Sequence, residues 1–86
     1  MNHGLTMLEL SVETVSGERY GFGIDREKTI VFIPGEEKAY PLISSGPIAV
    51  GYELRGICKK RGTLYSFESD KVKEIVAKFT LNQRFA

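Results

Sequence analysis

Residues 19–35, R-Y-G-F-G-I-D-R-E-K-T-I-V-F-I-P-G, decide the fold class. From Tyr20 to Ile24 every second residue is apolar and those between are glycine, a pattern typical of a strand with one buried face. Residues 25–28 are all charged and indicate a turn. Residues 29–33 are β-branched or aromatic throughout, as in a strand covered on both faces, and a Pro-Gly pair ends it. The stretch therefore predicts two strands joined by a polar turn.

Further strands are predicted on both sides of this segment. Residues 8–13 alternate in the same way, and Ser16-Gly17 joins them to the next strand as a hairpin. Gly56 interrupts a later alternating run and marks a bulge or bend. Pro41 argues that residues 38–43 form a short edge strand. The predicted strands are 5–15, 19–24, 29–33, 48–58 and 63–67, with 38–43 as an additional one.

The period changes after residue 68, which predicts a helix at about 69–81. Four apolar residues recur at i, i+3, i+4 and i+7, and form one stripe. They are Val72, Ile75, Val76 and Phe79. Ser69 or Asp70 can cap the N-terminus, and Glu74 with Lys78 forms an i,i+4 ion pair. A helix this short needs the sheet for stability, so its stripe is expected to dock there.

These elements predict one mainly β domain spanning residues 1–86. Five strands, of which the first and fourth are long, with a wide connection between the third and fourth, match the order of an OB-like antiparallel barrel. The expected fold is thus a small five- or six-stranded barrel closed by the C-terminal α-helix. An SH3-like barrel, with residues 38–43 as an extra strand, is the alternative.

The composition is that of an ordinary globular protein. Hydrophobic residues make up 42% of the 86 residues, charged residues 27%, and the formal net charge is +1. The longest apolar run, residues 30–33, is far short of the roughly 20 residues of a membrane-spanning helix, so no membrane association is expected. No secretory signal is expected either. A single cysteine, Cys58, favours a reducing, cytoplasmic location.

Residues with catalytic chemistry are few and scattered. His3 is the only histidine and has no clustered cysteine for a zinc site. Cys58 is expected to be a small buried hydrophobe. Gly21-Phe22-Gly23 hints at a phosphate loop, but Arg26 stands where the third glycine would fall and no helix follows. The sequence therefore predicts a protein that is not an enzyme and needs no cofactor or metal.

The strongest functional signal is a basic cluster of four residues within seven positions, at residues 55–61. In an OB-like barrel this cluster would occupy the loop between the fourth and fifth strands, beside the ligand face. Single-strand binders combine such charge with aromatic rings that stack on bases. We predict binding of RNA or single-stranded DNA, although the rings also fit a core role. The predicted contacts are Arg19, Tyr20, Phe22, Arg55, Lys59, Lys60, Arg61 and Tyr65.

A second hypothesis is a protein-interaction or assembly module, either a homo-oligomer or a subunit of a larger complex. A chain of this size has a thin core that a partner could complete. The edge strand at 38–43 would offer unpaired backbone groups for strand addition. Leu81 and Phe85 add apolar side chains near the C-terminus.

Two segments also resemble a known family. Residues 21–25 (GFGID) followed by residues 29–36 (TIVFIPGE) resemble the start of a TRAM domain, an OB-like RNA-binding barrel, and residues 52–68 are similar to its closing hairpin with a basic turn. The resemblance implies RNA contact through the barrel face. The chain departs from the family in the long segment after Pro34-Gly35 and in the predicted C-terminal helix.

Overall fold

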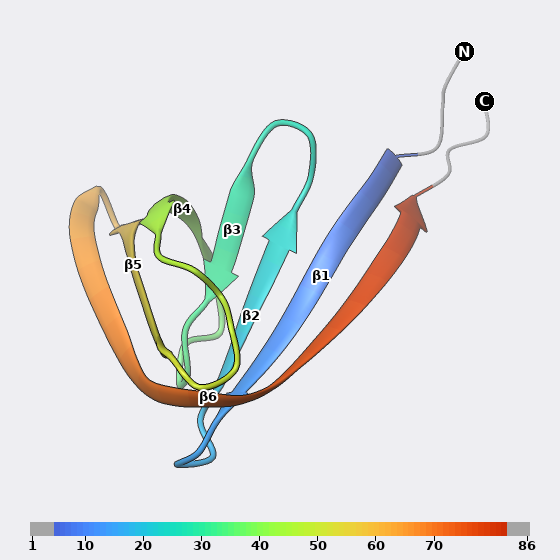
Figure 1. Cartoon of the computed structure of the whole chain (residues 1–86). Coiled ribbons are helices and arrows are strands. Elements are labelled where there is room, and N and C mark those ends of the chain that lie inside the picture. Colours follow the sequence, from blue (N-terminus) through green and yellow to red (C-terminus); the bar gives the residue numbers. More distant parts are fainter. Residues whose placement is uncertain (1–4, 83–86) are drawn as a thin grey trace.

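The computed structural model describes residues 5–82 and shows a closed, six-stranded antiparallel barrel (Figure 1). Each strand pairs with the next in the chain, and the last pairs with the first. The barrel confirms the predicted β class. The predicted C-terminal helix is wrong, because residues 5–82 contain only strands and turns. The strands are β1 (Leu5–Thr14), β2 (Arg19–Ile24), β3 (Thr29–Phe32), β4 (Ala39–Ser45), β5 (Glu53–Lys60) and β6 (Thr63–Asn82).

The barrel closes because β6 is long and bent. Its first part pairs with β5 up to Lys71, and its second part, from Val72 onward, pairs with β1 (Figure 1). The register slips at two places: β6 has one extra residue between the partners of Glu53 and Arg55, and another between those of Glu13 and Thr14. An extra residue on one strand is a β-bulge, which bends the strand and increases its twist. The two bulges carry β6 from one side of the barrel to the other.

The same bulges explain why residues 69–81 imitate a helix in sequence. The core-facing residues of β6 around the bend are Phe67, Ser69, Val72 and Ile75. Each bulge adds one residue to the two-residue period of a strand, so the inward positions fall three apart. Spacing of three and four is also the spacing of a helical stripe. Val76, assigned to that stripe, lies opposite Ser11 on the outer face and is 53% exposed.

A buried serine repairs the backbone pairing at the first bulge. Ser69 is 7% exposed. Its hydroxyl accepts a hydrogen bond from the backbone N–H of Leu54 at 2.9 Å and donates one to the carbonyl of Asp70 at 2.6 Å. Leu54 is completely buried, so its N–H would otherwise lack an acceptor in the core. Buried donors without partners are costly, and the hydroxyl removes that cost.

The segment between β3 and β5 differs from the prediction in two ways. β4 is an interior strand: it pairs with β3 through residues 39–41 and with β5 through residues 42–45. Pro41 is tolerated because its exposed ring lies on the outer face and pairing with β5 starts only after it. Residues 46–52 form a loop, so the strand predicted at 48–58 begins only at Glu53. Ile48 in this loop packs against the core, and Gly51 and Tyr52 form backbone hydrogen bonds with Val72.

The core fills the barrel from every strand. Phe67 lies over Gly56, where an added Cβ would come within 2.5 Å of its ring, so a glycine is required at this position. The same ring lies 5.7 Å, centroid to centroid, from Tyr20. Cys58 is fully buried, which confirms the prediction that it is a small buried hydrophobe. The buried apolar residues are Val12, Tyr20, Phe22, Val31, Ile33, Tyr40, Leu54, Cys58, Phe67 and Val72.

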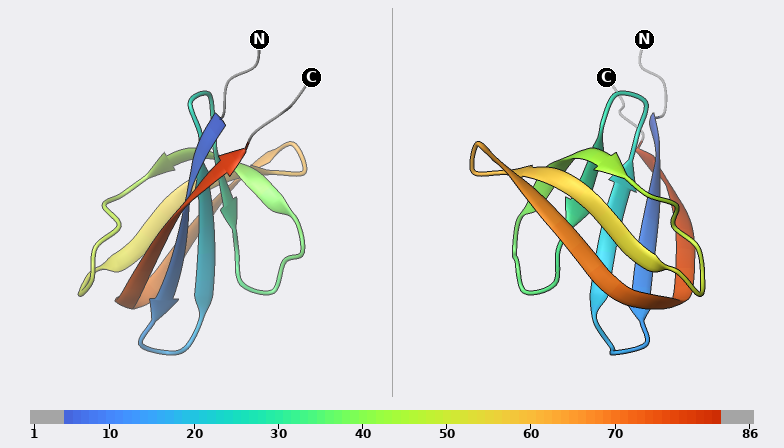
Figure 2. Two further views of the ribbon diagram at one scale, coloured as in Figure 1. Left: turned by 90° about the vertical axis from the view of Figure 1, so that its right-hand side faces the viewer. Right: turned by 60° about the vertical axis from the view of Figure 1, so that its left-hand side comes forward.

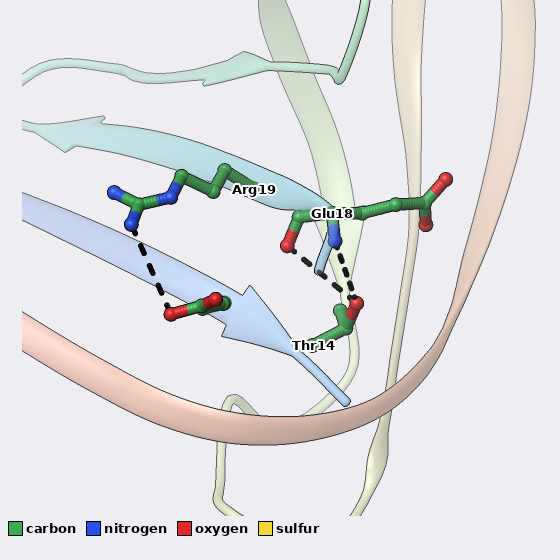
Figure 3. Close-up of polar contacts among 4 residues, drawn as sticks. Thr14, Glu18 and Arg19 are labelled. Carbon is green, nitrogen blue, oxygen red and sulfur yellow. Dashed lines mark hydrogen bonds and ion pairs between the residues drawn. The ribbon is translucent and has the colours of Figure 1, made fainter. Parts of the chain in front are cut away.

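A buried threonine holds the turn between β1 and β2. Thr14 is fully buried, and its hydroxyl accepts a hydrogen bond from the backbone N–H of Glu18 at 3.2 Å (Figure 3). The backbone N–H of Thr14 donates to the Glu18 carbonyl at 2.9 Å. Gly17 takes a φ of 92°, which glycine adopts easily. The turn sets Arg19 on the outer face, where its guanidinium lies 3.9 Å from the carboxylate of Glu13.

Candidate interaction surfaces

The basic residues predicted to bind phosphate lie at and before the turn between β5 and β6. Lys60 pairs with Thr63, so Arg61 and Gly62 form a two-residue hairpin turn. Both have positive φ, 53° and 81°, as a type I′ turn requires. The loop predicted between the fourth and fifth strands is therefore a tight turn of two residues. It also brings Lys59, Lys60 and Arg61 to one corner of the barrel.

The charge of Lys60 is compensated within the protein. Its Nζ lies 2.6 Å from Oε2 of Glu36, and the Tyr40 hydroxyl donates to Oε1 of the same carboxylate at 2.9 Å. The ammonium also lies 4.7 Å from the centroid of the Tyr65 ring. The hydrogen bond from Lys60, followed by that from Tyr40, lowers the pKa of Glu36, and the hydrogen bond to Glu36 raises the pKa of Lys60. Lys60 therefore ties the turn to the segment after β3.

Two other predicted phosphate contacts also have carboxylate partners. Arg55 lies 3.4 Å from Glu68 across the β5–β6 ladder, and Arg19 lies 3.9 Å from Glu13 on the far side of the barrel. Both guanidinium groups are mostly exposed, so these ion pairs contribute little to stability. Lys59 and Arg61 are exposed, and neither forms an ion pair with any described residue. The turn thus retains two exposed cations without an ion pair among the described residues.

The three rings predicted to stack on bases lie in different environments. Tyr20 and Phe22 are 5% and 2% exposed, and both belong to the core. Burial, with the nearby carboxylate of Glu18 and phenol of Tyr65, raises the pKa of Tyr20. Tyr65 is 39% exposed and already has Lys60 against its ring. Of the predicted rings, only Tyr65 therefore offers surface to a ligand, close to Lys59 and Arg61.

A second surface lies along the last part of β6. Residues 74–82 pair with β1 on one side, Lys73 is the extra residue of the bulge before them, and among residues 5–82 no strand pairs with the other side of residues 73–82. We call this other side the open β6 edge. Figure 1 shows the second half of β6, in red, beside β1 at one margin of the sheet, and the left view of Figure 2 turns this side toward the viewer. A strand edge of this length exposes a row of backbone N–H and C=O groups.

Apolar side chains are exposed on both faces beside the open β6 edge. Phe79, opposite Leu8, lies on the face that continues into the core and is 72% exposed. Ala77 on the same face is also exposed. On the outer face Val76 is 53% exposed and stands between two charged residues, Glu74 and Lys78. The edge therefore combines unpaired backbone with exposed apolar surface.

The outer face beside this edge also holds two facing carboxylates. Glu74 lies directly opposite Glu13 in the β1–β6 ladder, and like charges in such pairs are destabilising. Arg19 offsets the charge of Glu13 from the β2 side. No ion pair of Glu74 forms within the described residues.

The sequence prediction contains no open edge at residues 73–82, because the apolar spacing of residues 69–81 predicts a helix and Pro41 indicates an edge strand at 38–43. The alternation of Ile75, Ala77 and Phe79 with Val76 and Lys78 is the signal that could have found it. Leu81 lies in β6, whereas His3 and Phe85 lie outside the described residues.

The described residues hold no group of three or more histidine, cysteine or acidic residues arranged to bind a metal ion. No helix within residues 5–82 is long and apolar enough to cross a membrane. Comparison of the chain with known protein families, curated proteins and solved structures found no match in any of the three. The resemblance to TRAM domains stays a prediction.

Proposed function

We propose that this protein is a non-enzymatic protein-interaction module that binds an extended strand along the open β6 edge. The observation that carries the proposal is the one-sided pairing of residues 73–82. Strand addition to a free sheet edge obtains affinity from main-chain hydrogen bonds and specificity from alternate side chains. The exposed Phe79 and Val76 provide apolar contacts on the two faces of such a strand.

The open β6 edge is more available to a partner than the predicted nucleic-acid contacts are. Glu74, Lys78 and Lys73 interrupt its apolar positions, and such charges restrict pairing to partners of complementary charge. By contrast, of the eight residues predicted to contact nucleic acid, three cations are paired with carboxylates and two rings are buried.

A labelled peptide with the sequence of residues 72–82 tests this function. We expect saturable binding to the full chain, with slowed amide exchange confined to residues 73–82 of the protein. A peptide of the same sequence N-methylated at every residue has no backbone N–H donor for a ladder on either edge and should not bind. Binding of both peptides alike, or unchanged exchange in β6, would contradict strand addition.

A second candidate function is binding of RNA or single-stranded DNA at the β5–β6 turn. Lys59 and Arg61 are its exposed cations, and Tyr65 is its exposed ring. A fluorescent oligonucleotide should then bind with affinity that falls with salt. Replacing both cations with Ala should reduce the log–log salt slope by about 1.4, since each single-strand phosphate contact contributes roughly 0.7. Replacing Lys73 and Lys78 is the matched control, and an unchanged slope in the turn variant would exclude this site.

A further inference from the structure

We infer that the strand bound at the open β6 edge is β6 of a second copy of this chain, antiparallel to the first, with Val76 on the two-fold axis. This inference rests on the proposed function and names its partner. A two-fold axis perpendicular to the sheet makes the interface isologous, so each residue of the edge meets the same surface in reverse order. The sequence of the edge can therefore be tested for complementarity with itself.

The outer face of the edge is self-complementary in charge. Its side chains follow the order Glu74, Val76, Lys78. When Val76 faces the partner's Val76, Glu74 faces the partner's Lys78 and Lys78 faces the partner's Glu74. Opposite charges directly across an antiparallel pair are stabilising. The central position is then an apolar contact between two valines that are each 53% exposed in the single chain.

Other symmetric registers lose this match. A two-fold axis at Ile75 or Ala77 would place Val76 opposite the partner's Glu74 or the partner's Lys78. An axis at Glu74 or at Lys78 would place two like charges against each other, which is destabilising. The Val76 register alone among these five satisfies both charges and the apolar position. The charged residues thus select one pairing and oppose slipped ones.

The position of Glu74 gives an independent reason for a cation on the open side. Glu74 faces Glu13 within its own sheet, and Arg19 reaches Glu13 from beyond it. In the Val76 register the partner's Lys78 stands beside Glu74 on the side away from Glu13. The partner therefore supplies the positive charge that Glu74 lacks among the described residues of its own chain.

The face that continues into the core also matches in this register. Ile75 faces the partner's Ala77, and Ala77 faces the partner's Ile75, so the apolar surface continues from β1 through both copies of β6. Phe79, at 72% exposure, adjoins this row. The pairing covers the open edge of both copies over residues 73–79, because residues 80–82 face the partner's residues 70–72, which already pair with β5 and with the loop 46–52.

A cysteine at the two-fold axis tests the register. Facing residues of an antiparallel pair have Cα atoms about 4.5–5.5 Å apart, which lies within the range of a disulfide. Cys58 is buried, so Val76→Cys adds a single exposed thiol. Under mild oxidation we expect disulfide-linked dimers to form at least tenfold faster than with Val50→Cys, a valine of similar exposure in the loop 46–52. Equal rates, or faster linkage of the Val50→Cys variant, would overturn the proposed interface.

Exchanging the charges of residues 74 and 78 tests whether the partner is a second copy of this chain. Glu74→Lys and Lys78→Glu each place two like-charged pairs in the homodimer, so each variant alone should dimerise at least tenfold more weakly in light scattering. When the two variants are mixed in equal amounts, a mixed dimer has opposite charges at both positions. The mixture should therefore restore the dimer. Melting curves of each variant check that the barrel is folded. A mixture that stays as monomeric as its folded components would overturn the inference.

The outcomes separate this inference from the proposed function. A full-length chain that remains monomeric at high concentration, yet protects residues 73–82 when the 72–82 peptide binds, would overturn the second copy and leave strand addition standing. A monomer that also fails to bind the peptide would remove both. A dimer that is trapped through Val76→Cys and restored in the charge mixture supports both.

Discussion

The two halves of β6 belong to one strand and have opposite surroundings. Before the bend two side chains that face the barrel, Phe67 and Ser69, are only 6% and 7% exposed. In residues 72–79 burial fades along the strand, from Val72 at 2% to Phe79 at 72%. The first half lies over the core formed with β2 and β5, whereas the second half extends with β1 past that core (Figure 1).

This difference in burial indicates that one half of β6 stabilises the fold and the other half serves association with a partner. The first half contributes aromatic burial and the hydrogen bonds that let the strand bend, so changes there should act on folding. Beyond Ile75 the second half contributes an unpaired edge and exposed apolar residues, so changes there should act on binding with little effect on folding. One strand thus closes the barrel at its bend and presents a surface at its end.

The largest expected contrast is between the two phenylalanines of β6. Phe67→Ala removes a ring packed on Tyr20 and Gly56, and should lower the free energy of unfolding by about 3–5 kcal/mol. Phe79→Ala, measured on the dilute chain, should change it by no more than about 0.5 kcal/mol. Denaturant titration of both variants measures the contrast. Similar losses for the two would show that the end of β6 is part of the core.

A smaller effect is expected at the bulge that joins the two halves. Ser69→Ala leaves the buried N–H of Leu54 without its acceptor, which should cost about 1–3 kcal/mol in the free energy of unfolding. Ser66→Ala changes an exposed serine of the same strand and serves as the control. Thermal melting compares them. A Ser69→Ala variant as stable as the control would mean that the hydroxyl does not support the bend.

The smallest effect concerns the charged cluster against the first half of β6. The pKa of Glu36 is lowered by its hydrogen bond from Lys60, so its ionised form stabilises the folded chain above the unfolded-state pKa of about 4.3. That contribution is lost as the pH falls through the lower folded-state pKa. Glu36→Gln should therefore have a lower Tm than the wild type at pH 7, and the gap should narrow toward pH 3. Glu37→Gln, at an exposed position, is the control. A difference in Tm between Glu36→Gln and the wild type that widens in acid would contradict a stabilising role for ionised Glu36.

Much of the barrel could be predicted from local pattern. The strands at 19–24 and 29–33 follow from alternation and β-branched residues, and the turn at Arg61-Gly62 follows from glycine beside charged residues. Cys58 could be placed in the interior from its type alone. These features depend on neighbours within a few residues, so a single sequence is enough to show them.

The candidate surfaces depended on contacts between distant residues. Lys60 looked like a free cation because its partner, Glu36, lies on another segment. Tyr20 could be a stacking ring or a core ring until Phe67 was placed beside it. Pro41 pointed to an edge strand because the two separate pairings of β4 could not be seen in sequence.

The sequence by itself determined that the chain is β-rich, that its turns lie where glycine and charge cluster, and that its catalytic residue types are sparse. Only the tertiary structure decided the state of residues 69–82. Their apolar spacing satisfies a helix and a bulged strand equally, because each bulge converts a period of two into a step of three. The choice was made by β1 and β5, whose backbone N–H and C=O groups needed partners that a helix could not offer.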